Sequence, residues 1–386
     1  MVGFDSPISE IDGRVQATRN VEIRLLEVVQ PEEMPLLTGR CELASLTSAR
    51  CGCDDQANSV PSVANITDRA NRQALPKVGT PDCKDRMAKS EKLELVEAIE
   101  PEVDRLTTEH LNRRSDWYYH DIVPWERGES FRDKPWDVSQ TTISENARTS
   151  LVLNLLTEDN LPYYHALIEK HMPQTSAFVR WNRLWTAEEG QHAIAIRSYL
   201  LTSRNADPYQ LEDDRKATMM NGYQPTYDDP TEIFAYTATQ ELATRVSHRN
   251  AGKITDDPSA YELMRYIASD ENHHFIFYKE VMRAMLDRAP DLVLDGIYRV
   301  FSNFEMPGVA MPNFLRRSIQ VAKAGVYNLR IHHDRVLMPL IKDWDIGGLT
   351  DLTPVAAERQ EKIMKLPDLI LRKAEIFEKR VGVSYA

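Results

Sequence analysis

The sequence predicts an all-α protein built around a four-helix bundle, with additional helices on the flanks of the bundle. The first observation is a repeated motif: Glu-x-x-His occurs twice, once ending at His192 and once ending at His274. Residues three apart lie on the same face of a helix, so each copy offers one carboxylate and one imidazole to the same side. The second observation is that a lone glutamate, Glu158 or Glu241, precedes each copy by about thirty residues, which is the length of two antiparallel helices and a short connection. Two such hairpins packed together form the bundle.

Six side chains of these motifs are expected to meet inside the bundle: Glu158, Glu189, His192, Glu241, Glu271 and His274. Isolated buried charges cost several kcal/mol each, so buried carboxylates persist only when they are paired or bound to a metal. Four carboxylates neutralise two divalent cations. Carboxylates and imidazoles with open coordination positions suit non-haem iron or manganese better than structural zinc, whose sites are tetrahedral and closed. The sequence therefore predicts a centre of two metal ions.

Proline and capping residues locate the first two helices of the bundle. The first helix is expected from Ser144, a good N-cap, to about His171. Pro162 cannot donate a hydrogen bond to the carbonyl of Glu158, so this helix is expected to bend or loosen there. The second helix is expected after Pro173, ending at about residue 202.

The later helices have similar start signals. A polar segment is expected to form a loop after residue 202, and the third and fourth helices then begin at Asp229-Pro230 and Asp257-Pro258. Aspartate at the N-cap followed by proline is a strong start signal. Beyond the bundle, whose core spans about 141–287, we expect a helix after Pro290, a long helix ending near Met338 and a last helix from Thr353.

Residues 1–86 differ from the rest of the chain. They mix Pro, Ser, Asn and Asp without sustained periodicity, whereas Met87 begins a pattern of apolar residues at helical spacing. We interpret residues 1–86 as a segment of low order, which is either disordered or lies upstream of the native chain. We interpret residues 87–386 as the functional domain. All four cysteines, Cys41, Cys51, Cys53 and Cys83, lie in the first segment, and their spacing fits neither common zinc nor iron–sulfur patterns.

Composition restricts the class of protein. The formal net charge is −12, which argues against nucleic acid as the main partner. No apolar run approaches the length of a membrane span. We expect a cytoplasmic protein with free thiols.

Two further residues share the faces of the predicted centre. Thr244 follows Glu241 by one helical turn, and Asp270 directly precedes the second motif. Without the motifs, a threonine bonded to its own helix and an aspartate on a solvated edge would be the simpler interpretations. The remaining histidines lack a carboxylate at matching spacing and are not expected to be ligands: His110, His120, His165, His171, His248, His273, His332 and His333.

The motifs resemble those of the soluble acyl-acyl-carrier-protein desaturases, with flanking residues closer to the actinobacterial branch than to the plant branch. The similar stretches are Thr157-Glu-Asp-Asn-Leu-Pro162, Trp185-Thr-Ala-Glu-Glu-Gly-Gln-His192, Gln240-Glu-Leu-Ala-Thr244 and Asp270-Glu-Asn-His-His274. Trp117-Tyr-Tyr-His-Asp-Ile-Val-Pro124 resembles an aromatic motif ahead of the plant bundle. The resemblance spans roughly residues 93–344.

This resemblance implies a ferritin-like fold and a di-iron site formed by the six side chains of the motifs. It also implies that Thr244 lies beside the oxygen site and that Trp117, Asp270 and His192 form an electron route. It further implies that the substrate is an acyl chain on acyl carrier protein and that dioxygen is the co-substrate. A ferredoxin-type protein would donate the electrons, and the protein would form a homodimer.

The sequence departs from the plant pattern near the ligands. Gly190-Gln191 replaces Asn-Arg, and Asn272-His273 with Phe275 replaces Lys-Arg and a closing Glu. These changes spare every ligand but alter the groups around them, which tune ligand orientation and redox behaviour.

The implied chemistry is removal of two hydrogens from an unactivated alkyl chain in fatty acid biosynthesis. No side chain is a sufficient oxidant, so the metals must supply the difficult step. Three alternatives stay open: a ferritin- or rubrerythrin-like oxidase, a ribonucleotide reductase radical subunit, and a non-enzymatic, carrier-binding relative. The second would need a tyrosine one turn beyond the first motif, where this chain has Ile196.

Three cations suggest where an acidic carrier could dock. Arg316, Lys323 and Arg330 recur every seven residues in the predicted long helix after the bundle. A solvated charged face is the simpler interpretation, and a docking surface is the alternative.

Overall fold

The computed structural model describes residues 83–172, 176–223, 227–308 and 311–383. Within these ranges every regular element is a helix and none is a strand, which confirms the all-α prediction. The expectations for residues 1–82, including Cys41, Cys51 and Cys53, lie outside the described residues.

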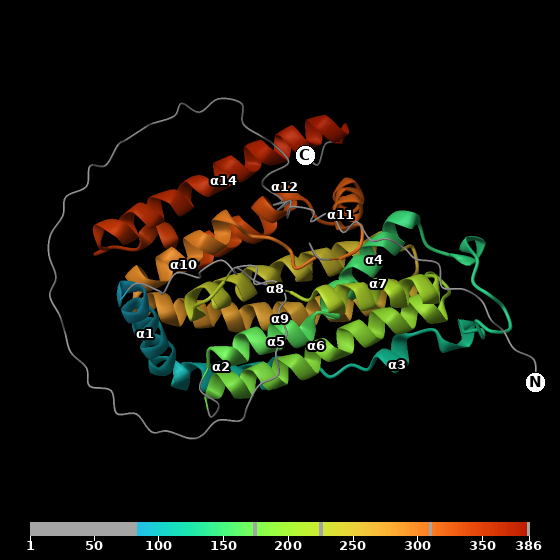
Figure 1. Cartoon of the computed structure of the whole chain (residues 1–386), viewed down its shortest axis with the longest axis horizontal. Helices are drawn as coiled ribbons and strands as arrows, with labels where there is room; N and C mark the ends of the chain where they lie inside the picture. The colour runs from blue at the N-terminus through green and yellow to red at the C-terminus, as the bar shows by residue number, and fades with distance from the viewer. Residues whose placement is uncertain (1–82, 173–175, 224–226, 309–310, 384–386) are drawn as a thin grey trace, which may run out of the picture.

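Four long helices form the ferritin-like bundle: α4 (Glu145–Glu158), α6 (Ala177–Thr202), α8 (Pro230–Lys253) and α9 (Pro258–Arg288). Figure 1 shows them running side by side across the middle of the molecule. The α8–α9 pair makes the most extensive contact between helices, and α6 packs on α4 and α9. Large side chains such as Trp181, Tyr199 and Tyr278 are fully buried between the helices, and this burial of apolar surface is the main force that holds the bundle together.

The predicted caps are present. Ser144 accepts a hydrogen bond from the Ala147 amide, and Asp229 and Asp257 each accept two backbone hydrogen bonds in the first turn of α8 and α9. These bonds satisfy amide groups that have no partner inside the helix, so they fix where the bundle helices begin.

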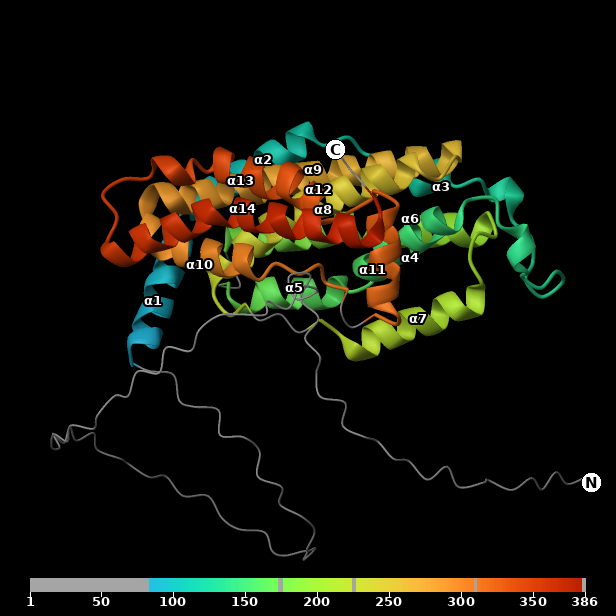
Figure 2. The same cartoon turned by 90° about the horizontal axis from the view of Figure 1, so that it is seen from above.

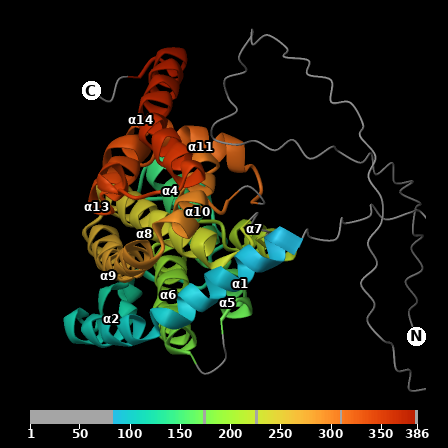
Figure 3. The same cartoon turned by 90° about the vertical axis from the view of Figure 1, so that its left-hand side faces the viewer.

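Further helices cover two sides of the bundle. On one side lie α2 (Glu100–Arg113) and α3 (Tyr119–Ile122), which pack on α6 and α9, whereas α1 (Cys83–Ala98) lies across one end of the bundle (Figure 1) and contacts α2, α8 and α9. On the other lie α10 (Pro290–Ser302), α11 (Phe314–Lys323), α12 (Leu329–His332), α13 (Met338–Asp343) and α14 (Pro354–Val381). Figure 3, an end view, shows the bundle between these two groups, and Figure 2 shows α14 lying along the bundle. Short 3-10 turns occur at Trp125–Arg127, Val138–Gln140 and Ile346–Gly348.

The predicted helix from Ser144 to His171 is divided in two. Helix α4 ends at Glu158, and α5 (Leu161–Lys170) begins after Asn160. Pro162 lies in the first turn of α5, where its missing N–H leaves no bond unmade. The disturbance predicted at Pro162 is thus a complete break in the helix directly after the predicted ligand Glu158.

The polar segment after α6 is not all loop, so that prediction is wrong. Helix α7 (Pro208–Asn221) lies within it, and the Asp207 side chain accepts hydrogen bonds from the Tyr209 and Gln210 amides. Asp207-Pro208 is the same start signal that correctly located α8 and α9.

The predicted long helix ending near Met338 is also wrong, because the segment is interrupted twice. Helix α11 ends before Gly325, whose φ of +71° lies outside the helical region. Helix α12 then begins after Asn328, whose side chain accepts a hydrogen bond from the Ile331 amide. A π-helical turn, His333–Leu337, then leads into α13, where Pro339 occupies the first turn.

Helical structure also extends upstream of Met87, since α1 begins at Cys83. The chain then changes direction at Ile99, and Pro101 lies in the first turn of α2. Within the described residues, no helix combines the length and apolar character needed to cross a bilayer.

Candidate metal centre

The six predicted ligands lie together in the middle of the bundle, each from its expected helix. They form two overlapping groups whose ligand atoms all lie within 4.8 Å of one another: Glu158, Glu189, His192 and Glu271, and Glu189, Glu241, Glu271 and His274. Glu189 and Glu271 belong to both groups. Every one of the six side chains is buried, none more than 6 % exposed.

Both histidines turn Nδ1 towards the carboxylates. His192 Nδ1 lies 3.1 Å from Glu189 and 3.3 Å from Glu271. His274 Nδ1 lies 2.8 Å from Glu189 and 3.6 Å from Glu241. The two Glu-x-x-His motifs therefore face each other. His192 contacts Glu189 of its own helix and Glu271 of α9, whereas His274 contacts Glu189 of α6 and Glu241 of α8.

The electrostatics of the cluster are those of a cation site. Burial, together with the charges of Glu189 and Glu271, raises the pKa of Glu158 to about 8 despite its hydrogen bond with His248. Burial and the charge of Glu271 likewise raise the pKa of Glu241 well above its ordinary value. Without cations, protons must therefore neutralise part of the cluster. Metal binding displaces such protons and relieves the repulsion.

Several buried candidate ligand atoms make no hydrogen bond within the described chain: Glu189 Oε1, Glu241 Oε2, Glu271 Oε1 and His274 Nδ1. They contact one another, His192 and His248 at ion-pair distances. Buried polar atoms are nearly always hydrogen-bonded, so this group of atoms in one place needs an explanation. Carboxylate oxygens and imidazole nitrogens are ligands of non-haem iron and manganese. The residues present fit a pair of divalent cations that share Glu189 and Glu271.

Thr244 points into the same centre, as its spacing predicts. Its Oγ1 lies 2.7 Å from Glu271 Oε2 and also 3.1 Å from the Gln240 carbonyl oxygen. The threonine thus makes the ordinary helical contact and contacts a ligand as well.

Trp117, Asp270 and His192 form a continuous chain of contacts. Trp117 Nε1 donates to Asp270 Oδ2 at 2.7 Å, and the same oxygen lies 3.2 Å from His192 Nε2. The Trp117 ring also stacks on the His192 ring, with 6.4 Å between centroids. These three residues, distant in sequence, connect the ligand His192 to the side of the bundle covered by α3.

Three residues near the centre were not predicted from the sequence. His248 is buried, and its Nε2 lies 3.0 Å from Glu158 Oε1 and 3.5 Å from Glu271 Oε1. It stands two helical turns after Glu241, and this spacing would have placed it on the ligand face. Glu188 and His110 contact each other and the outer side of His274.

The centre borders an apolar cavity of about 160 Å³. Aromatic and aliphatic side chains of α4, α10, α11 and α14 line most of it, including Leu153, Phe301, Phe314 and Ile370. Thr157 borders this cavity and also the small space between the ligands. Thr157 directly precedes the candidate ligand Glu158, so the two spaces adjoin at this end of α4.

The comparisons with known proteins agree with this geometry. The family model described as fatty acid desaturase matches residues 91–385. A Mycobacterium tuberculosis protein whose name describes it as an acyl-[acyl-carrier-protein] desaturase, DesA1, is 39% identical over 307 residues, which cover 76% of this chain and 91% of that protein. The stearoyl-[acyl-carrier-protein] 9-desaturase of Spinacia oleracea is 26% identical over 310 residues, which cover 74% of this chain and 76% of that protein.

A solved structure gives the same result for the fold. The X-ray structure of DesA2 from Mycobacterium tuberculosis H37Rv, also described as an acyl-ACP desaturase, has a TM-score of 0.57 and 26% identity, and covers 69% of this chain and 99% of that chain. The higher identity to a mycobacterial protein than to the spinach enzyme confirms the expected likeness to the actinobacterial branch. The chain belongs to the fatty acid desaturase family.

Proposed function

We propose that the protein is an oxygen-dependent desaturase that introduces a double bond into a fatty acyl chain carried as a thioester on acyl carrier protein, in fatty acid biosynthesis. The observation that carries this proposal is the apolar cavity that shares Thr157 with the small space between the two overlapping ligand groups. An iron-storage or oxidase relative needs the ligands but not the cavity, so the cavity favours a reaction on an alkyl chain. The family and the names of the relatives support the same substrate class.

The six ligands would hold two iron ions. Glu158 and His192 would bind one ion, Glu241 and His274 the other, and Glu189 and Glu271 belong to both groups. When iron and dioxygen are bound, they supply the oxidising power that no side chain has. In the complete reaction the acyl chain gives up two hydrogens, an external donor gives two electrons, solvent gives two protons, and one dioxygen becomes two waters.

The protein's own residues position the reactants. The apolar cavity walls bury the acyl chain and exclude water, and Thr157 borders the passage to the ligands. Thr244 holds Glu271 by a hydrogen bond beside the place expected for dioxygen. Trp117 and Asp270 would carry electrons from a ferredoxin-type donor towards His192.

The carrier would dock near α11. Leu315, Ser318 and Ala322 of α11 line the cavity, and the exposed cations Arg316 and Lys323 lie on the same helix. The predicted third member, Arg330, is different: it lies in α12 and its guanidinium binds both carboxylate oxygens of Glu378, at 2.6 and 2.9 Å. We therefore limit the docking proposal to the two residues of α11. The homodimer and the cytoplasmic location expected from the sequence remain parts of this proposal.

A reconstituted reaction tests the function. The iron-loaded protein is mixed with reduced ferredoxin, dioxygen and a panel of acyl carrier proteins that bear chains of different lengths, and the products are analysed by mass spectrometry. We expect a product lighter by two hydrogens that forms only with dioxygen and donor present. Iron-loaded protein that leaves every acyl chain unchanged while it consumes dioxygen would instead support the oxidase alternative.

A further inference from the structure

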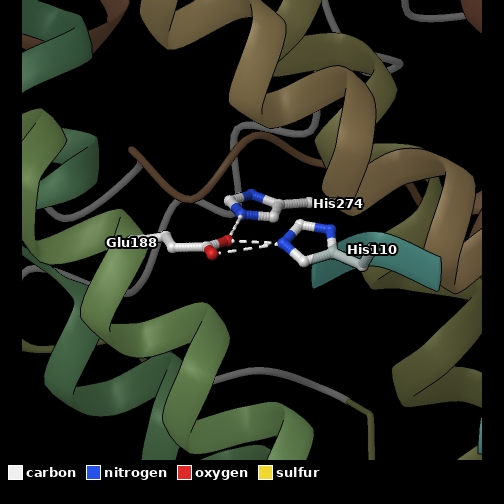
Figure 4. A group of neighbouring side chains, drawn as sticks. All are labelled: His110, Glu188 and His274. Atoms are coloured by element: carbon white, nitrogen blue, oxygen red, sulfur yellow. Dashed lines mark hydrogen bonds and ion pairs between the residues drawn. The ribbon is translucent and has the colours of Figure 1, made fainter. Parts of the chain in front are cut away.

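Glu188 is the acidic residue directly before the ligand Glu189, yet its side chain points to a different helix. Figure 4 shows its carboxylate between His110 and His274. Glu188 Oε2 lies 2.8 Å from His110 Nε2 and 2.9 Å from His274 Nε2. Arg114 contacts the other oxygen of the same carboxylate. Glu188 therefore joins α6 to the ligand His274 on α9 and to α2 on the outside.

The same arrangement occurs on the other side of the centre with the helices exchanged. Asp270 directly precedes the ligand Glu271 on α9, and its Oδ2 lies 3.2 Å from Nε2 of His192 on α6. Each acidic residue before a ligand glutamate thus contacts the histidine ligand of the opposite helix. Two such reciprocal contacts, built from corresponding positions of the two motifs, are not explained by packing of either helix alone.

The contact between Glu188 and His274 Nε2 determines which ring nitrogen of His274 faces the metal centre. A neutral histidine carries a proton on one ring nitrogen only, and a hydrogen bond from that nitrogen leaves the other free to bind a metal. A neutral His274 whose Nε2 donates to Glu188 would direct the lone pair of Nδ1 towards Glu189 and Glu241, the side on which the metal ion would bind. The carboxylate also stops the ring from rotating away from the centre.

We propose that Glu188 is a positioning residue that orients His274 for the second metal ion, and that His110 and Arg114 hold the Glu188 carboxylate in place. This inference rests on the proposed metal centre. It assigns a role to His110, which the sequence alone did not connect with the site, and it gives α2 a function beyond covering the bundle.

The two sides of the centre have different outer partners. Asp270 receives a hydrogen bond from the neutral indole of Trp117, whereas Glu188 contacts His110 and the cation Arg114. Because the Glu188 contacts involve only His274 among the six ligands, a change at Glu188 should affect the second ion selectively.

Metal titration of the full chain tests the proposal without any activity measurement. Metal-free protein is titrated anaerobically with Co²⁺, and binding is followed by its absorption bands and by metal analysis after dialysis. We expect two ions in the unchanged protein. In Glu188→Gln, which keeps the shape but removes the charge, we expect one ion to bind about 10- to 100-fold more weakly and the other to bind unchanged. Glu188→Asp should restore part of the lost affinity.

Glu232→Gln is the matched control. Glu232 is also a glutamate on a bundle helix, with a side chain 5% exposed against 13% for Glu188, but it contacts Arg299 and not the centre, so both ions should bind as in the unchanged protein. If Glu188→Gln does not fold, as judged by circular dichroism, His110→Gln tests the same contact from α2 and should weaken the same ion to a smaller degree.

The outcomes separate this inference from the function it rests on. Suppose that the unchanged protein binds two ions. If Glu188→Gln then binds both with unaltered affinity, or binds both more weakly to the same degree, the role of Glu188 is overturned and the metal centre stands. No bound ion in the unchanged protein would overturn the metal centre itself.

Discussion

Acid should destabilise this protein partly through one buried histidine that lines the apolar cavity, His332. Its ring is 6% exposed, stacks on Phe304 with 5.0 Å between centroids, and accepts a hydrogen bond from the Tyr327 hydroxyl at 2.9 Å. Burial, together with the charge of His333, lowers the pKa of His332 to about 4. In the unfolded chain the pKa of a histidine is about 6.5.

The sign and size of the effect follow from these two pKa values. Because the folded pKa is the lower one, the stabilisation is complete above pH 6.5 and is lost as the pH falls towards 4. Each pH unit within this window is worth about 1.4 kcal/mol, so lowering the pH from 7 to 5 should cost about 2 kcal/mol from this residue.

The perturbation is His332→Asn, whose side-chain oxygen can still accept from Tyr327 but cannot take up a proton in this pH range. The free energy of unfolding is measured by urea denaturation of the metal-free protein at pH 7 and pH 5. Other titrating groups are the same in both proteins, so only the difference between the two pH dependences is interpreted. We expect the unchanged protein to lose about 2 kcal/mol more than the variant.

His120→Asn is the control, because it makes the same substitution at an exposed position outside the cavity. Parallel pH dependences for the unchanged protein and His332→Asn would refute the reasoning. That result would mean that the cavity admits enough water to keep the His332 proton equilibrium close to that of the unfolded chain.

Three further predictions concern the centre, the carrier and the first segment of the chain. Replacing Glu189 or Glu271 by alanine should abolish turnover and lower the iron content from two ions, measured by metal analysis, and an active variant would contradict the ligand assignment. Charge reversal of Arg316 and Lys323 together should raise the KM for the acyl carrier several-fold, with a smaller effect at high salt, whereas an unchanged KM would make them ordinary surface residues. A chain that begins at Met87 should fold, bind two irons and turn over with an external donor; loss of donor-dependent turnover with iron retained would show that the removed segment has a role in reduction.

The sequence by itself determined the helix starts of the bundle and the six candidate ligands. Both depend on spacing within one helix or on a cap a few residues from its partner, as at Asp229 and Asp257. Such local rules hold whatever the rest of the chain does, because a three-residue separation places two side chains on one face of any α-helix. The two Glu-x-x-His motifs therefore predicted the contents of the centre before its geometry was known.

The same local rules also apply to two features that were not predicted, the helix α7 and the position of His248. Asp207-Pro208 carries the start signal of α7, and His248 lies at helical spacing from Glu241. Applied at these positions, the same rules would have found both features.

Only the tertiary structure decided which distant groups surround the ligands. His110 reaches Glu188 from 78 residues away, and Arg330 binds Glu378 across 48 residues. No periodicity relates such positions, since their proximity depends on how α2 and α14 pack on other helices. The six candidate ligands were therefore evident from the chain, whereas the groups that contact them follow from the packing of helices that are remote in sequence.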